Sequence, residues 1–313
     1  MSEMIDPLAS PIPDPAVEES REEQTTGKPM SKWTLYSRRF LRNKPAVGGI
    51  VIFVLLVLFA IIAPLVAKYD HIELDFLALS SPPSPEHWFG TTPSGNDAFA
   101  QVAIGLQRSL MIAVSVSLGT TVLSAIIGTA AAYFGGMTEK ITLMVIHFMM
   151  VIPSFLILSL LSNKSGGDWR VIALIMIFVT GWYFPARVVW TTALSLRERE
   201  YVHAARYMGV GGFRIVLRHL IPNIGSLLII NFTLGIVNAV MAETGLSFIG
   251  FGVKIPDVSL GSLIGSGANI ITSAPWLFYF PAAALTLLTV SMALVADGLR
   301  DALDPTSAAG GRA

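Results

Sequence analysis

The chain has 313 residues, of which 53% are hydrophobic and only 13% are charged. Soluble domains carry about 25% charged residues, so this composition predicts a protein that crosses a membrane several times. The sequence holds no cysteine, which excludes disulfides and thiolate metal sites. Its formal net charge is zero, which argues against a nucleic-acid partner.

The N-terminal region changes character at residue 31. Residues 1–30 hold seven acidic and two basic residues with five prolines, which predicts a disordered acidic cytoplasmic tail. They lack the positive start and apolar core of a signal peptide. Residues 31–45 hold five Lys and Arg, no acid, and interleaved aromatic residues, so we expect a basic helix in the interface of membrane lipid. The alternative is an ordinary positively charged flank, and both interpretations place this end in the cytoplasm.

Six apolar stretches follow, each close to the ~20 residues that a helix needs to cross a bilayer. They lie at residues 46–67, 109–134, 141–161, 171–196, 220–242 and 274–296. The third contains one ionisable residue, His147, which we expect to be hydrogen-bonded between helices. We therefore predict an all-α polytopic membrane protein with six transmembrane helices within residues 46–305, followed by a C-terminal tail at 306–313.

The positions of Lys and Arg predict the orientation of these helices. With the N-terminus inside, the inside segments hold 16 Lys and Arg and the outside segments hold five. Because positive residues are enriched on the cytoplasmic side, both termini and the loops at 135–140 and 197–219 are predicted to be cytoplasmic.

Two long external segments remain, at residues 68–107 and 243–273. In the first, Ser94 and Asp97 predict the cap of a helix that begins near Ala98. The second is too rich in glycine for a span and predicts a re-entrant or surface-lying segment. Glu243 is expected at the end of a span, where its charge can reach water.

Small residues recur at four-residue spacing in the second apolar stretch, at Ser124, Gly128 and Ala132. Such a stripe lets helices approach closely. Packing within one subunit and a pore-lining or subunit-contact role are both open at this point.

The sequence contains no catalytic or nucleotide-binding motif. It has no GxxxxGK[ST] phosphate loop, no HExxH pair and no acid-base constellation. We predict that the chain is not an enzyme and holds no metal or cofactor of its own.

Residues 195–223 form a charged island between the fourth and fifth apolar stretches. Ser195 and Glu198 fit a capping box, and Gly209 fits a helix terminator. The helix between them would carry an apolar stripe formed by Tyr201, Ala204, Ala205 and Met208. A short helix packed only on its own bundle is the alternative to a surface that another protein approaches.

This island resembles the cytoplasmic signature loop of ABC-importer permeases, which reads E-A-A, three residues, Gly, nine residues and then two residues before Leu-Pro. Here the corresponding positions are His203-Ala204-Ala205, Gly209, and His219 to Pro222. Four more stretches resemble the second permease subunit of the dipeptide, oligopeptide and nickel group. They are RRFLRNKPAVGGIVI, FGTTPSGNDAFAQVAIGLQRSL, AETGLSFIGFGV and APWLFYFPAAALTLLTVSMALVADGLRDALDP.

The resemblance covers about residues 32–305 and implies the type I ABC importer permease fold in a bacterial plasma membrane. It implies a homologous permease partner, two cytoplasmic ATPase subunits that bind ATP and Mg, and an external substrate-binding protein. Peptides are the expected cargo, with nickel or another small solute as the alternative. The implied ATPase-coupling residues are Glu200, Tyr201, His203, Ala204, Ala205, Met208, Gly209, His219 and Pro222.

We expect the face formed by Ala204 and Ala205 to fit a groove on the ATPase. Two positions depart from the family pattern, because His203 replaces the signature glutamate and Asn96 replaces an arginine in the external segment. Two other classes stay open. A secondary transporter usually carries charges within its spans, which are nearly absent here, and a membrane scaffold would leave the charged island unexplained.

Overall fold

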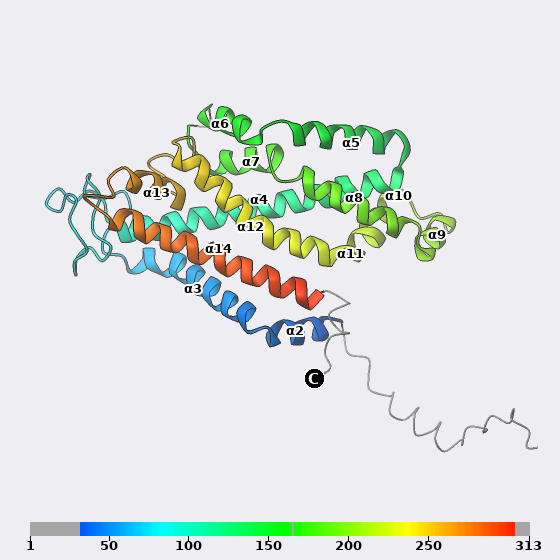
Figure 1. Cartoon of the computed structure of the whole chain (residues 1–313), viewed down its shortest axis with the longest axis horizontal. Helices are drawn as coiled ribbons and strands as arrows, with labels where there is room; N and C mark the ends of the chain where they lie inside the picture. Colours follow the sequence, from blue (N-terminus) through cyan, green and yellow to red (C-terminus); the bar gives the residue numbers. More distant parts are fainter. Residues whose placement is uncertain (1–31, 165, 304–313) are drawn as a thin grey trace, which may run out of the picture.

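The computed structural model describes residues 32–164 and 166–303, and over these residues the protein is built of helices (Figure 1). The described residues contain no strand, and one isolated bridge joins Thr91 to Asp97. The prediction of an all-α fold is therefore confirmed. The predicted tails at 1–30 and 306–313 lie outside the described residues.

Two helices joined by a single residue open the described chain. The first, α2, spans Lys32–Arg42, so a helix is present where the basic segment predicts one. The second, α3, spans Lys44–Val66, and the side chain of Asn43 caps it by accepting a hydrogen bond from the Ala46 amide at 3.2 Å. Proline at the first turn costs no hydrogen bond there, so Pro45 does not interrupt α3.

The centre of the bundle is α4, Ala98–Phe134, which packs on α3, on three of the four helices described next (α5, α7 and α8), and on α12 to α14. Its 37 residues span about 55 Å, longer than the ~30 Å hydrocarbon core of a bilayer. The predicted start near residue 98 is confirmed, and Asp97 caps it by accepting a hydrogen bond from the Ala100 amide at 2.8 Å. Ser94 takes no part in this cap.

The third and fourth apolar stretches form bent helix pairs instead of continuous helices. In the third, α5 (Gly136–Val151) and α6 (Ser154–Lys164) meet at 79°. Pro153 lies in this break, and proline disfavours helical geometry in the residue before it. In the fourth, α7 (Trp169–Val179) and α8 (Tyr183–Arg197) meet at 42°.

The remaining chain contains three short helical pieces and three longer helices. The short pieces are α9 (Glu200–Tyr207), α10 (Gly212–Ile215) and α11 (Ile221–Asn223), with the π-helical turn η1 (Val216–Leu220) before α11. The longer helices are α12 (Gly225–Phe248), α13 (Leu260–Ala268) and α14 (Trp276–Leu303).

Four of these helices, α3, α4, α12 and α14, are long and apolar enough to span a membrane, and there are up to six spans if each bent pair counts as one. One end of the bundle gathers α2, α9, α10 and the turn between α4 and α5, while the opposite end carries α13 and the connection from 67 to 97 (Figure 1). The segments predicted to share a side therefore do so. Which side is cytoplasmic remains a prediction.

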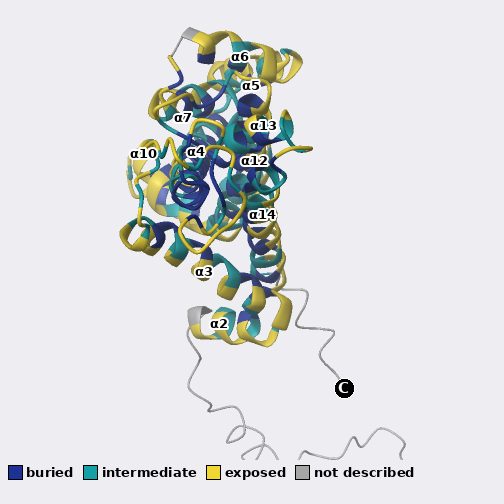
Figure 2. Ribbon diagram, turned by 90° about the vertical axis from the view of Figure 1, so that its left-hand side faces the viewer, coloured by how far each residue is buried: buried dark blue, intermediate teal, exposed yellow. Residues whose placement is uncertain are grey.

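Close helix packing explains the stripe of small residues on α4. Ser124, Gly128 and Ala132 are all buried, and Figure 2 shows the buried residues concentrated around α4 at the middle of the bundle. A Cβ atom added at Gly128 would lie 2.5 Å from the carbonyl oxygen of Ala186 and 2.8 Å from Val189 Cγ1 on α8. The stripe thus packs within this chain, as one of the two interpretations predicted.

We predict that Gly128→Val forces α4 and α8 apart and lowers the free energy of unfolding by about 2 kcal/mol. The matched control is Gly48→Val on α3, because an added Cβ there would meet nothing within 4 Å. Thermal unfolding of each purified variant in detergent measures the two changes in stability. Equal stability of the two variants would contradict the close contact.

Candidate functional site

The charged island contains the end of α8, the short helix α9 and the pieces α10, η1 and α11. The predicted capping box is wrong, because α8 continues to Arg197 and Ser195 therefore lies inside it. Glu198 is instead the C-cap residue of α8. Helix α9 begins after Arg199, whose backbone is extended. Gly209 ends α9 with a φ of +76°, a geometry that favours glycine. The predicted terminator is therefore confirmed.

One face of α9 packs against its own chain. Val202 and Ala205 are each 2% exposed and lie in a small apolar cluster with Ile215, Val216 and Leu220 of α10 and η1. The expectation that Ala204 and Ala205 form one outward face is therefore wrong for Ala205, whose side chain is buried. The reason is Val202, three residues earlier on the same face, which our expectation left out of the stripe. This residue was recognisable in the sequence as the β-branched member of an i, i+3 apolar pair.

The residues that α9 leaves exposed form a different set. Tyr207 is 88% exposed, Met208 is 76% exposed, and Tyr201 and Ala204 are also exposed. Phe213, at the start of α10, is 56% exposed. Large side chains at this end of the molecule thus face away from the bundle, and Tyr207 and Phe213 were not among the predicted site residues.

Arg197 ties this corner to the end of α4. Its Nη1 donates a hydrogen bond to the carbonyl oxygen of Ala132 at 2.7 Å, where the last turn of α4 has carbonyls without a partner in the helix. Its Nε donates to Glu198 Oε1 at 2.8 Å. This hydrogen bond, with the charge of the guanidinium, holds the pKa of the Glu198 carboxyl below its ordinary value. A cation here also suits the helix dipole of α4.

His203 lies beside this pair, with its Nε2 3.6 Å from Glu198 Oε2. It is half-buried in the wall of a groove of about 350 Å³ between the end of α4 and α9. A glutamate at this position would place a second carboxylate next to Glu198. The histidine that replaces the signature glutamate at position 203 therefore lies where the carboxylate of Glu198 is already present.

The other predicted residues lie at the start of α9 and beyond its end. Glu200 and Pro222 are exposed, and His219 is half-buried within η1. The π-helical turn around His219 was not predicted, and the Ile221 amide there donates to the Val216 carbonyl, five residues back. Its sequence signal is Pro222, which has no N–H to offer the preceding turn. The predicted set is thus divided between the exposed side of α9, its buried side and the start of the following helices.

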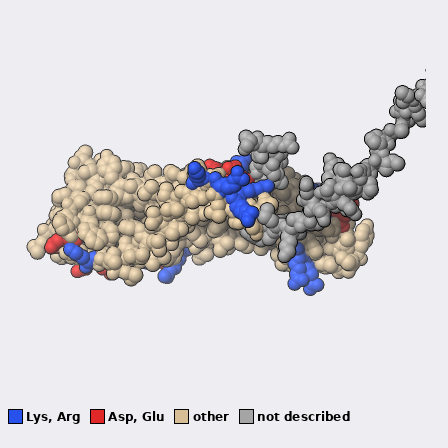
Figure 3. Space-filling view, turned by 90° about the horizontal axis from the view of Figure 1, so that it is seen from below, with Lys and Arg blue, Asp and Glu red and all other residues tan. Residues whose placement is uncertain are grey.

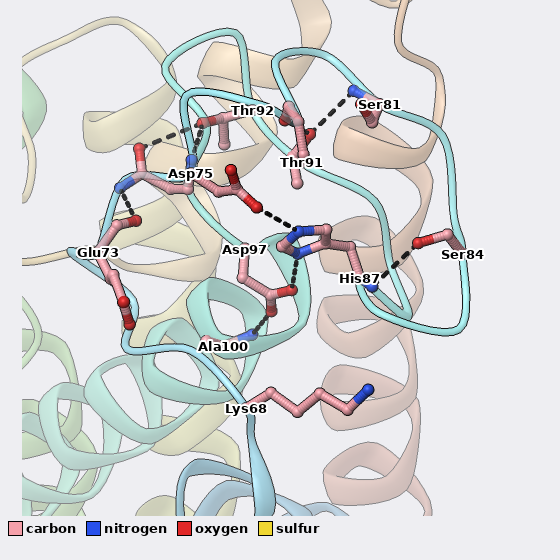
Figure 4. A network of polar contacts seen from close by, with 12 residues as sticks. Lys68, Glu73, Asp75, Ser81, Ser84, His87, Thr91, Thr92, Asp97 and Ala100 are labelled. Atoms are coloured by element: carbon pink, nitrogen blue, oxygen red, sulfur yellow. Dashed lines mark hydrogen bonds and ion pairs between the residues drawn. The ribbon is translucent and has the colours of Figure 1, made fainter.

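The opposite end of the molecule holds a second polar site in the connection from 67 to 97. His87 is 3% exposed, and its ring nitrogens lie 2.8 Å from Asp97 Oδ2 and 3.4 Å from Asp75 Oδ2 (Figure 4). Tyr69 stacks on its ring with centroids 4.5 Å apart. Because Asp97 also caps α4, this histidine fixes a long segment without regular structure to the start of the central helix.

Asn96 belongs to the same segment. Its side-chain Nδ2 donates to the carbonyl oxygen of Glu73 at 3.2 Å, and its backbone N–H donates to Thr92 Oγ1 at 3.0 Å. The residue that departs from the family pattern therefore holds two parts of the connection together. Within residues 32–164 and 166–303, no group of three His, Asp or Glu side chains is placed to hold a metal ion.

A buried carboxyl group was missed by the sequence interpretation. Glu243 is 0% exposed, because α12 continues to Phe248 and α13 folds back over it. The expectation that its charge reaches water is therefore wrong. Its Oε1 accepts a hydrogen bond from Ser247 Oγ at 2.6 Å, and Oε2 has no hydrogen-bond partner among the described residues. Ser247 Oγ in turn accepts from the Val253 amide at 3.2 Å, which closes the turn after α12.

The expectation for His147 is also wrong. This residue is exposed on α5 and makes no hydrogen bond to another helix in the described part of the chain. The adjacent side of α5 is exposed as well, since Ile146 is the one buried residue of that helix.

We predict that His87→Ala lowers the free energy of unfolding by about 3 kcal/mol, because it leaves two carboxylates facing each other without the group between them. His71→Ala in the same connection is the control. The His71 side chain pairs with the exposed Asp70, and such surface pairs contribute about 1 kcal/mol or less. Chemical denaturation of the purified protein compares the two. Similar losses would contradict the anchoring role of His87.

Comparisons with known proteins match two family models to this chain. A family model described as "Binding-protein-dependent transport system inner membrane component" matches residues 121–308. A second, described as "N-terminal TM domain of oligopeptide transport permease C", matches residues 31–83. Together they cover α2, α3 and most of the bundle, including α9.

Curated relatives match nearly the whole chain. The oligopeptide transport system permease protein OppC of Mycobacterium tuberculosis (strain H37Rv) is 42% identical over 278 residues, which are 88% of this chain and 96% of that protein. OppC of Bacillus subtilis is 34% identical over 283 residues, 90% of this chain and 92% of that protein. A putative peptide permease protein of Brucella suis is 35% identical over 272 residues, 86% of this chain and 89% of that protein.

Proposed function

We propose that this chain is a permease subunit of a peptide ABC importer. The chain belongs to the family of binding-protein-dependent transport system inner membrane components, and the proposal proceeds from this membership. The observation that carries the proposal is the 42% identity to an oligopeptide permease over 96% of that protein. The printed names of the relatives support peptides as the cargo.

The proposed importer contains further subunits. A homologous permease would supply the other half of the translocation path, and an external binding protein would deliver the peptide. Two cytoplasmic ATPases would bind ATP and Mg, since this sequence contains no phosphate-binding loop. These partners follow from the kind of machine to which the family belongs, and each stays a proposal for this chain.

Coupling to the ATPases would take place at α9. Its exposed residues Tyr201, Ala204, Tyr207 and Met208 form the proposed docking surface, with Ala205 holding the helix to the permease from the other side. The apolar cluster under α9 and the bond from Arg197 to the end of α4 join the docking helix to the central helix. Movement of the ATPases would then displace α9 and α4 together, as one rigid body in a switch between two discrete arrangements.

We predict that Ala204→Trp reduces copurification of the ATPases at least tenfold, because truncating or blocking a central contact costs more than about 1.4 kcal/mol. Ala204 is exposed, so the permease itself keeps its stability. Ala204→Ser is the conservative control and keeps the ATPases bound. Ala205→Trp is expected to unfold the α9 corner instead, which thermal unfolding detects. Normal copurification with Ala204→Trp would contradict the docking surface.

Arg197→Gln is predicted to leave the ATPases bound but to weaken coupling. The side chain loses its hydrogen bonds to the Ala132 carbonyl and to the exposed Glu198, and the partly buried bond to Ala132 is of a kind that contributes about 1.5–3 kcal/mol. Peptide uptake per ATP hydrolysed, measured in proteoliposomes with the complete complex, is expected to fall severalfold. The control Arg199→Gln removes an exposed charge from the same corner and leaves the ratio unchanged. An unchanged ratio for Arg197→Gln would contradict the role of this link.

A further inference from the structure

An apolar groove lies at the end of the bundle where α2 crosses α14. Its volume is about 430 Å³. Residues of α2, α3, α12 and α14 line it, among them Tyr36, Leu41, Ile50, Ile229, Val295 and Leu299. We refer to it as the α2 groove. Its walls are formed almost wholly by carbon, so water gains little by filling it.

The position of α2 gives this groove a closed end. Phe40 is 8% exposed and packs with Ala46 and Ala302, which fixes α2 across the ends of α3 and α14. Leu41, the next residue, is 67% exposed, and both Phe40 and Leu41 line the groove. The walls extend along α3 and α14 to Ile50 and Val295, about two helical turns from the ends of those helices. The groove therefore runs from α2 along the outer surface of α3 and α14.

The charges around the groove have one sign on the side of α2. Residues 31–69 contain no acidic residue, whereas Arg38 and Arg42 are exposed and Arg39 is half-buried. Figure 3 shows a central group of Lys and Arg side chains, with Asp and Glu atoms beside it, on a face that is largely uncharged. Among the described residues, α14 carries two acids toward this end, Asp297 and Asp301, and Asp301 Oδ2 accepts a hydrogen bond from Asn43 Nδ2 at 3.1 Å. Within residues 32–164 and 166–303, the side of the groove formed by α2 therefore carries basic residues and no acid.

Two of these arginines are neighbours of groove residues on the helix surface. Arg38 lies three residues before Leu41, and Arg39 lies three residues after Tyr36, a spacing that places side chains next to each other. Long basic side chains can lay their carbon stems on an apolar surface and keep the charge at its edge. The site therefore combines an apolar slot with cations at its mouth.

We propose that the α2 groove binds one acyl chain of an anionic phospholipid from the leaflet that contacts α2, with the lipid phosphate held by Arg38 and Arg39. A phospholipid has this combination of an apolar tail beside a negative group, and juxtamembrane basic residues are attracted to anionic lipid. A protein segment in the groove would need an acidic residue beside an apolar stretch of matching length. The proposal does not depend on the transported cargo.

The absence of cysteine in the chain allows a direct test. Ile50→Cys places a fluorescent label in the groove, and Val51→Cys places it on the adjacent exposed residue outside the groove lining. The complete transporter is reconstituted in nanodiscs that contain phosphatidylcholine and phosphatidylglycerol, with the acyl chains of one or the other lipid brominated. Bromine quenches the label only on contact, so the ratio of the two quenching efficiencies reports which lipid occupies each position.

At position 50 brominated phosphatidylglycerol is expected to quench more strongly than brominated phosphatidylcholine, and at position 51 the two are expected to be equal. Replacing both Arg38 and Arg39 by Gln should reduce the preference at position 50 about fivefold for each cation removed. Replacing both by Lys should retain it. Equal quenching at position 50, or quenching by neither lipid because protein fills the groove, would overturn the proposal. Copurification of the partner subunits checks that each variant assembles.

Discussion

The structure depends on how closely other helices can approach α4. Three of its glycines make this possible, each toward a different neighbour. An added Cβ at Gly105 would lie 3.0 Å from Leu263 of α13, one at Gly119 would lie 2.9 Å from Ile177 of α7, and one at Gly128 would meet α8. In a lipid environment helices gain little from hydrophobic burial against each other, so close contact between small residues contributes much of the association.

This central helix also connects the two polar ends of the molecule. At its start Asp97 both caps the helix and holds His87, which fixes the connection from 67 to 97. At its end the carbonyl of Ala132 accepts a hydrogen bond from Arg197, beside the α9 corner. Because α4 is continuous between these points, a displacement at one end can reach the other without passing through a flexible joint. The bent pairs α5–α6 and α7–α8 offer no such continuous path.

The sequence predicted those features that depend on composition and local spacing. Apolar length located the four long apolar helices and the two bent pairs, and the Asp97 cap and the Gly209 terminator followed from local helix chemistry. It did not predict features set by contacts between distant segments. Glu243 became buried because α13 folds over α12, and Ala205 turned inward because α10 and η1 supply an apolar cluster beneath it. The breaks at Pro153 and Gly181 carried a local signal, but an apolar run alone does not reveal them.

The central claim is that α9 and α4 move as one body when the ATPases act. Spin labels at Arg199→Cys beside α9 and Val122→Cys on α4 test it by the distance between them in the complete transporter, with and without trapped ATP. Both positions are exposed, and the chain has no other cysteine. We predict one unchanged distance distribution while ATP hydrolysis and uptake proceed. A shift on ATP binding that approaches one helical turn, about 5 Å, would show that α9 moves independently and would contradict the account.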